Sequence, residues 1–135
     1  MSPDLRALLF YLLLSAMLCF LQMLVAAAGA NTQVGLPTLA GNREGLPDMM
    51  GWAGRARRAH LNMIENLVLF TALVLITAIS GKANATTAMG AMIFFWARLA
   101  YAVIYLIGIP WLRTLAWFVS VIGLAMIAWV LLQAL

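Results

Sequence analysis

The chain has 135 residues, of which 66% are hydrophobic and only 9% are charged, and its mean hydropathy is +1.03. A soluble domain of this size needs more polar surface, so the composition excludes that class and indicates an integral membrane protein. At roughly 20 residues per transmembrane helix, the length accommodates about four spans and no second domain. The net charge of +4 comes from cations at the ends of apolar segments, so no nucleic-acid partner is expected.

Four apolar segments are expected to cross the membrane as helices, over about residues 4–30, 53–80, 85–107 and 110–135. The first begins like a secretory signal, but its apolar core is longer than the ~7–15 residues of such a signal, which favours a retained span. The connection that follows contains four glycines and two prolines, which argue against continuous helix. The predicted fold is an all-α, single-domain bundle of four transmembrane helices.

The distribution of Lys and Arg predicts the orientation of these spans. The first and third connections share one side of the membrane, and that side carries five arginines. Both termini and the second connection share the other side, which carries only Arg6 and Lys82. The positive-inside rule therefore places the first and third connections in the cytoplasm and both termini outside.

Two ionisable residues are expected inside the membrane. The charge-free part of the second span, residues 66–80, covers about 22 Å, less than the ~30 Å hydrocarbon core, so Glu65 must enter that core. The uncharged stretches on either side of Arg98 are likewise too short to span alone. Both side chains lie about 15 Å from the cytoplasmic surface, so we expect them to be partners. Ionisable residues at this depth are candidate functional residues.

Helical phase gathers further polar side chains near this pair. Five residues of the second span fall within about a 100° arc: Arg55, Arg58, Asn62, Glu65 and Asn66. On the third span, Arg98, Tyr101 and Tyr105 share a face, and Arg113 lies near the start of the fourth. His60 falls on a different face. The sequence therefore predicts a polar pocket facing the cytoplasm, whose excess positive charge suits a small anion.

Each of these features also has a purely structural explanation. Arg55, Arg57 and Arg58 could anchor their helix at the membrane interface. Glu65 and Arg98 could form a structural buried pair, and the two tyrosines could be packing residues. The coincidence of depth, helix face and charge sign is what favours a functional site.

The stretch RARRAHLNMIENLVLF, residues 55–70, resembles the signature of the MAPEG superfamily, the membrane-associated proteins in eicosanoid and glutathione metabolism. That signature has an arginine, then Arg-Ala-His-x-Asn-x-x-Glu, then an apolar stretch ending in Phe. The stretch WARLAYAVIYL, residues 96–106, is also similar to the family, with a tyrosine seven residues after its arginine. The resemblance covers nearly the whole chain. It looks most like the short bacterial members, which implies a bacterial inner membrane.

The resemblance implies a homotrimer with three glutathione sites, each between neighbouring subunits. The implied ligand-binding residues are Arg55, Arg58, Asn62, Glu65, Arg98, Tyr101 and Tyr105. Arg113 matches the arginine that stabilises the glutathione thiolate in some members, which makes it the expected catalytic residue. His60, Asn66 and Thr114 are implied to support the site from its surroundings. The end of the first span, residues 26–35, lacks the arginine that several active members place there.

The predicted function is therefore a glutathione-dependent membrane transferase or peroxidase that acts on lipophilic electrophiles, with glutathione as co-substrate and no metal. Guanidinium groups favour the thiolate form of a nearby thiol, and the thiolate is the nucleophile. Two alternatives stay open. The pocket could bind a different small anion, or the chain could be a non-enzymatic membrane scaffold or transporter. Proton-coupled export is disfavoured because the first span offers only Ser15, Cys19 and Gln22 as polar or reactive groups.

Overall fold

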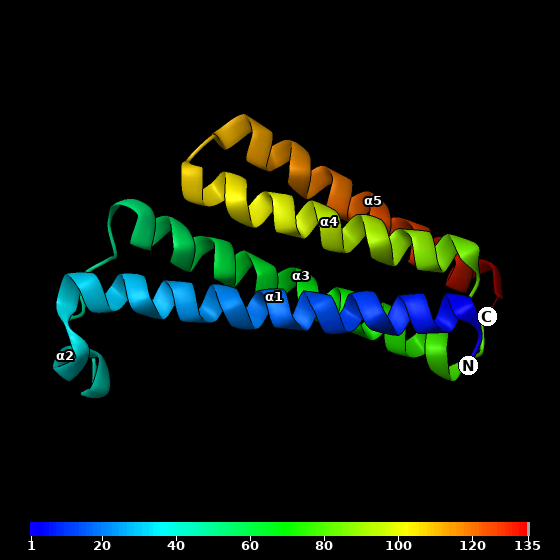
Figure 1. The fold of residues 1–135 in the computed structure, drawn as a ribbon, viewed down its shortest axis with the longest axis horizontal. Coiled ribbons are helices and arrows are strands. Elements are labelled where there is room, and N and C mark those ends of the chain that lie inside the picture. Colours follow the sequence, from blue (N-terminus) through cyan, green and yellow to red (C-terminus); the bar gives the residue numbers. More distant parts are fainter. Residues whose placement is uncertain (135) are drawn as a thin grey trace.

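The computed structural model describes residues 1–134, which form four long helices and one short one (Figure 1). The helices are α1 (Pro3–Val34), α2 (Leu36–Ala40), α3 (Gly51–Ile79), α4 (Ala85–Ile107) and α5 (Pro110–Ala134). Apart from α2, each is long and apolar enough to cross a membrane. The predicted fold class, an all-α membrane protein with four spanning helices, is confirmed. The expected end of the last span, Leu135, lies outside the described residues.

The first connection is more helical than its glycines and prolines predict. α1 continues to Val34 instead of ending near residue 30, and the five-residue α2 follows at once. Gly35 separates the two helices because its φ of 80° is a left-handed conformation that other residues rarely adopt. Pro37 then stands in the first turn of α2, where its missing N–H costs nothing.

Local sequence sets both ends of α4. At its start, Thr87 N donates to Asn84 Oδ1 over 3.0 Å, and Asn84 N donates to Thr87 Oγ1 over 2.9 Å. This reciprocal pair satisfies backbone donors that the first helical turn leaves free. At the other end, Gly108 takes a left-handed conformation with φ 92°, and Pro110 begins α5 two residues later. The turn between α4 and α5 is therefore short and sharply defined.

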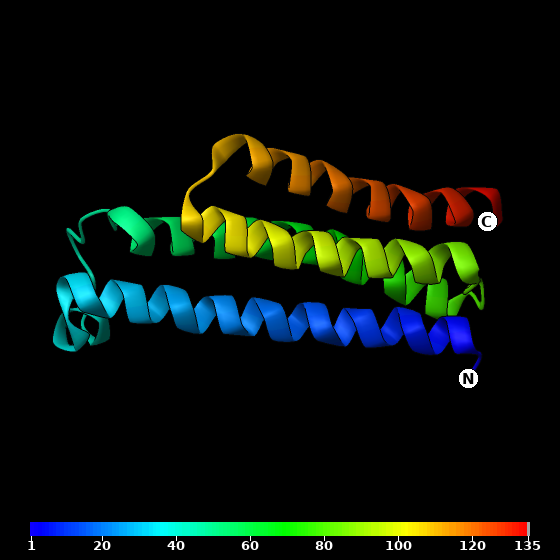
Figure 2. The same cartoon turned by 45° about the horizontal axis from the view of Figure 1, so that its top comes forward.

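The long helices alternate in direction. Both termini and the α3–α4 connection lie at one end of the bundle, here called the terminal end (Figures 1 and 2). α2 and the α4–α5 turn lie at the opposite end, here called the α2 end. α4 and α5 make the most extensive helix–helix contact, followed by α1 and α3. The bundle is thus two helix pairs packed together.

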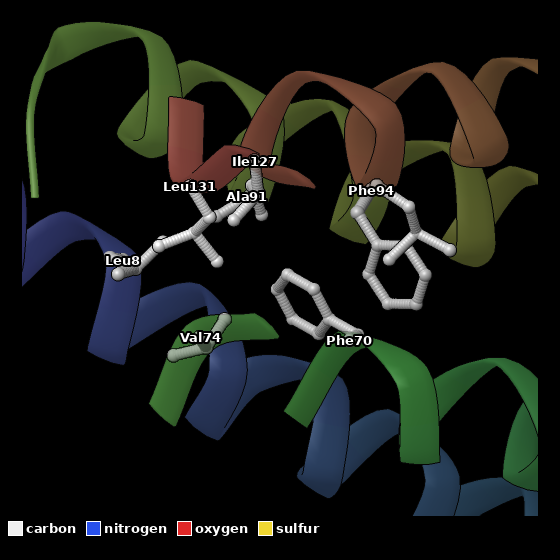
Figure 3. Close-up of a cluster of buried hydrophobic side chains, with 8 residues drawn as sticks. Leu8, Phe70, Val74, Ala91, Phe94, Ile127 and Leu131 are labelled. Atoms are coloured by element: carbon white, nitrogen blue, oxygen red, sulfur yellow. The ribbon is translucent and has the colours of Figure 1, made fainter. Parts of the chain in front are cut away.

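Apolar side chains fill the terminal end. Phe70 of α3 stacks on Phe94 of α4 with ring centroids 4.0 Å apart, and Figure 3 shows Val74 and Ile127 in the same cluster. In a membrane the lipid is as apolar as these side chains, so van der Waals packing must supply the helix–helix affinity. The terminal end therefore holds the largest apolar cluster, and the arginines of α3, α4 and α5 lie nearer the α2 end.

Close backbone contact joins α4 to α5 at two glycines. A Cβ on Gly90 would lie 2.7 Å from the Gly123 carbonyl oxygen, and a Cβ on Gly123 would lie 2.5 Å from the Gly90 carbonyl oxygen. Neither position has room for a side chain without moving a helix. Small residues at such crossings let transmembrane helices pack closely.

Candidate anion-binding site

Polar side chains of α3, α4 and α5 converge on one open pocket in the α2 half of the bundle. Its volume is about 250 Å³. The lining residues, which define what is here called the anion pocket, are Asn62, Tyr101, Tyr105, Arg113, Thr114 and Trp117. The structure thus brings together residues that the sequence placed on the facing sides of three different spans.

Arg98 lies directly behind this pocket and is 1% exposed. Its Nη2 donates to Asn62 Oδ1 over 2.8 Å, and its guanidinium carbon lies 4.2 Å from the centroid of the Tyr101 ring. Within residues 1–134, its Nε and Nη1 are buried without a hydrogen-bond partner. A buried cation with unpaired donors is costly, so these two groups call for an acceptor that the described chain does not supply.

The expected pairing of Arg98 with Glu65 is wrong for the described chain. Arg98 bonds to Asn62, its remaining nitrogens are unpaired, and Glu65 is exposed. Helical phase gives the reason. Glu65 lies about 60° around α3 from Asn62, at the edge of the polar arc, so equal depth does not make it face α4.

Tyr105 connects arginines from two helices. Arg58 of α3 donates from Nε to Tyr105 Oη over 3.2 Å. The Arg113 guanidinium of α5 lies 4.3 Å from the centroid of the same ring, within cation–π range. Tyr101 packs edge-on against Tyr105 with centroids 5.5 Å apart. The two tyrosines therefore hold three arginines, Arg98 included, around one pocket.

Asn66 supports Asn62 from one turn further along α3. It is buried, and its Nδ2 donates to the Asn62 carbonyl oxygen over 2.8 Å. The same Nδ2 lies 3.4 Å from Asn62 Oδ1, the oxygen that accepts from Arg98. Two donors thus point at one amide oxygen, which fixes how the Asn62 amide is turned.

The other predicted residues lie around the pocket or away from it. Arg55 donates from Nε to the Leu106 carbonyl oxygen over 3.0 Å, which ties α3 to the last turn of α4. Thr114 lines the pocket and donates to the Pro110 carbonyl oxygen over 3.1 Å. His60 faces α1, where its Nδ1 lies 4.0 Å from the Cys19 sulfur, as the helical phase predicts.

The predicted set missed one residue of the pocket and misassigned one contact beside it. Trp117 lines it, and its position four residues after Arg113 is the sequence signal that could have included it. The hydrogen-bond acceptor of Arg98 was also misassigned. Helical phase and membrane depth restrict that acceptor to one face of α3, but they do not select one side chain on that face.

No group of three or more His, Cys, Asp or Glu that could hold a metal ion occurs in residues 1–134.

Fold and pocket together define an all-α polytopic membrane protein with an open polar pocket between its helices, which Arg113 lines and Arg58 and Arg98 adjoin. The MAPEG family profile matches residues 7–133. The chain belongs to the MAPEG family, which confirms the resemblance seen in the second and third spans.

Two mammalian proteins are similar to part of the chain. Microsomal glutathione S-transferase 1 of Mus musculus is 42% identical over 67 residues, which cover 49% of this chain and 43% of that protein. Microsomal glutathione S-transferase 1 of Rattus norvegicus is 40% identical over 67 residues, with the same coverage. The aligned region therefore spans less than half the length of either relative.

Proposed function

We propose that this chain is a glutathione-dependent membrane transferase or peroxidase that acts on lipophilic electrophiles. The observation that carries the proposal is the pair of unpartnered donors on Arg98, buried beside the anion pocket. Family membership supports it, and so does the similarity to two proteins named as glutathione transferases.

The residues around the pocket suit the chemistry of glutathione. The tripeptide carries two carboxylates, and arginine pairs with carboxylates through two parallel hydrogen bonds. Arg98 keeps unpaired donors on Nε and Nη1, which point to different sides of the guanidinium and are each available to a carboxylate oxygen, and Arg58 lies on the adjacent helix. Asn62, Tyr101 and Tyr105 add hydrogen-bonding groups for the amides of the tripeptide.

Arg113 is the residue proposed to act on sulfur. Bound glutathione supplies the thiol that attacks an electrophile or reduces a hydroperoxide. A guanidinium close to that sulfur stabilises the thiolate over the thiol. The Tyr105 ring, 4.3 Å from the Arg113 guanidinium, would restrict where this charge lies. An electrophile dissolved in the bilayer would approach from the side, which suits a pocket within the spans.

We also propose that three copies assemble and complete the site between them. Glu65 is exposed on α3 with Leu61, Ile64, Val68 and Leu69, which are all large and apolar. A carboxylate facing lipid at this depth is costly. Contact with a second copy would remove it from lipid and bring it to a ligand, where it could accept from the glutathione amino group.

The proposed location is a bacterial inner membrane, with the α2 end in the cytoplasm. Five arginines lie towards that end, in the first connection, the start of α3 and the start of α5: Arg43, Arg55, Arg57, Arg58 and Arg113. The terminal end carries Arg6 and Lys82. The positive-inside rule supports this orientation.

Thermal unfolding of the detergent-purified protein in millimolar glutathione tests the proposal. A ligand that binds only the folded state raises the unfolding temperature by mass action. We expect a rise for the wild type and none for Arg98→Met. The matched control Arg6→Met, which removes an exposed arginine at the terminal end, should behave as wild type. An equal rise in Arg98→Met, or no rise in any variant, would overturn the proposal, and a rise with another anion alone would select the different-anion alternative.

A further inference from the structure

A second cavity, of about 120 Å³, lies between α1, α3 and α4. Its walls include Leu18, Gln22, Ala56, Ala102 and Val103. Among the residues that the structure describes, the two cavities share no lining residue, because they lie on different faces of the α3–α4 pair. This α1 cavity is therefore a separate space from the anion pocket.

Of the described residues that line the α1 cavity, only Gln22 has a polar side chain. Gln22 is 8% exposed, and its Oε1 is buried with no hydrogen-bond partner in residues 1–134. A buried polar atom without a partner is uncommon, since its lost hydration is not replaced. The Gln22 amide oxygen can therefore accept a hydrogen bond from a ligand inside an otherwise apolar cavity.

Water is a poor occupant for this cavity. An ordered internal water needs two to four polar partners, and the cavity side chains offer one amide. An apolar cavity of comparable size, about 150 Å³ in an engineered protein, stays dry and binds benzene. A molecule with an apolar body and one hydrogen-bonding end matches both the walls and Gln22.

The cavity opens at the surface of the chain between α1 and α4. Leu21 of α1 and Val103 of α4 line its edge and are 56% and 51% exposed. Gln22 lies 12 residues before the end of α1, about 18 Å along the helix, so the opening is within the membrane. A lipophilic molecule could reach it by moving sideways between α1 and α4 without crossing water.

We propose that the α1 cavity binds a small uncharged lipophile that carries a hydroxyl group, an alcohol or a phenol, and that the hydroxyl bonds to Gln22. A hydroxyl both donates and accepts, so it can satisfy the amide whichever way the amide is turned. None of the described side chains that line the cavity is charged, which disfavours an ionised ligand. The site is independent of glutathione and needs no part of the anion pocket.

Photolabelling of the full chain in lipid vesicles with a diazirine-bearing octanol tests this site. We expect labels on the cavity-lining parts of α1 and α4, residues 18–25 and 99–106. Octanol should compete for the label, and methyl heptyl ether, which has similar length but cannot donate, should compete roughly tenfold less well, as the loss of one hydrogen bond predicts. Equal competition by the two molecules would show a simple acyl-chain groove and overturn the proposal.

Three variants separate recognition from folding. Gln22→Leu should abolish the preference for octanol over the ether, while the matched exposed change Gln133→Leu should keep it. Gln22→Leu should also unfold at the same or a higher temperature, because it removes an unpartnered buried amide. Val103→Trp, at the exposed edge, should block labelling. A Gln22→Leu protein that keeps the preference, or wild type without label in the cavity, would contradict the assignment. Stabilisation by glutathione should persist in all three variants. A failure of this proposal can therefore be distinguished from a failure of the proposed function.

Discussion

Arg98 of α4 and Asn62 of α3 are joined by a 2.8 Å hydrogen bond inside the membrane-spanning part of the bundle. The bond links two helices at a point where Nε and Nη1 of Arg98 have no hydrogen-bond partner in the described chain. Asn62 in turn lines the anion pocket. The hydrogen bond therefore holds the Arg98 guanidinium in place behind the anion pocket and leaves its other donors available to a ligand.

Replacing Asn62 by Leu should destabilise the protein by about 2–3 kcal/mol, because it leaves all of the buried Arg98 donors unpaired. Reversible unfolding in mixed detergent micelles would measure the change. In the double variant with Arg98→Met, much of the loss should be recovered, since both polar partners are then apolar. Strictly additive effects of the two changes would show that the hydrogen bond does not couple them.

Gly123→Ala should destabilise the α4–α5 pair by about 1–3 kcal/mol. A Cβ there would lie 2.5 Å from the Gly90 carbonyl oxygen, so the helices must separate. Gly41→Ala is the matched control, since Gly41 is exposed, has a negative φ, and a Cβ there would meet nothing closer than 3.5 Å. The same unfolding assay applies. A change at Gly123 no larger than that at Gly41 would mean that the contact tolerates a methyl group.

Tyr105 should contribute to glutathione binding in two separable ways. Tyr105→Phe removes the hydroxyl that accepts from Arg58 but keeps the ring beside Arg113, so we expect affinity to fall only several-fold. Tyr105→Leu removes both contacts and should cost more than roughly tenfold. Titration calorimetry with glutathione measures both. Equal losses in the two variants would assign the whole effect to the hydroxyl and leave the ring without a role.

Glu65→Leu distinguishes a lipid-facing α3 from an α3 covered by another copy. If the exposed face of α3 contacted only lipid, an apolar residue would be neutral or stabilising. We expect instead that the variant assembles less completely in native mass spectrometry and binds glutathione more weakly. Glu44→Leu, in the first connection, is the control for loss of an exposed carboxylate. A trimer with full glutathione affinity in Glu65→Leu would contradict this role.

The sequence predicted the fold and the neighbourhood of the pocket better than the contacts inside it. Span lengths and the intramembrane position of Arg98 follow from the hydropathy of the individual residues and the thickness of a bilayer, and neither depends on how the helices pack. The partner of Arg98 depends on how α3 is rotated against α4. An arc of five polar residues leaves that rotation undetermined, so Asn62 was not distinguished from Glu65.

Other features depend on contacts that no single segment encodes. The left-handed Gly35 that lets α2 follow α1 reads in the sequence only as a helix breaker. The α1 cavity arises because Ala56 and Ala102 leave space between three helices. In the sequence, Gln22 was one of a few polar groups in α1, and its isolation became visible only with its neighbours in place.

The proposed function requires that the anion pocket binds glutathione as its thiolate, stabilised by Arg113. The most direct measurement is the ultraviolet thiolate absorbance that appears when glutathione is added to the purified protein at neutral pH. We expect a saturable thiolate signal in wild type and in Arg6→Met, and its loss in Arg113→Met at glutathione concentrations that still saturate the site. Glutathione that binds without any thiolate signal, or a full signal in Arg113→Met, would contradict it.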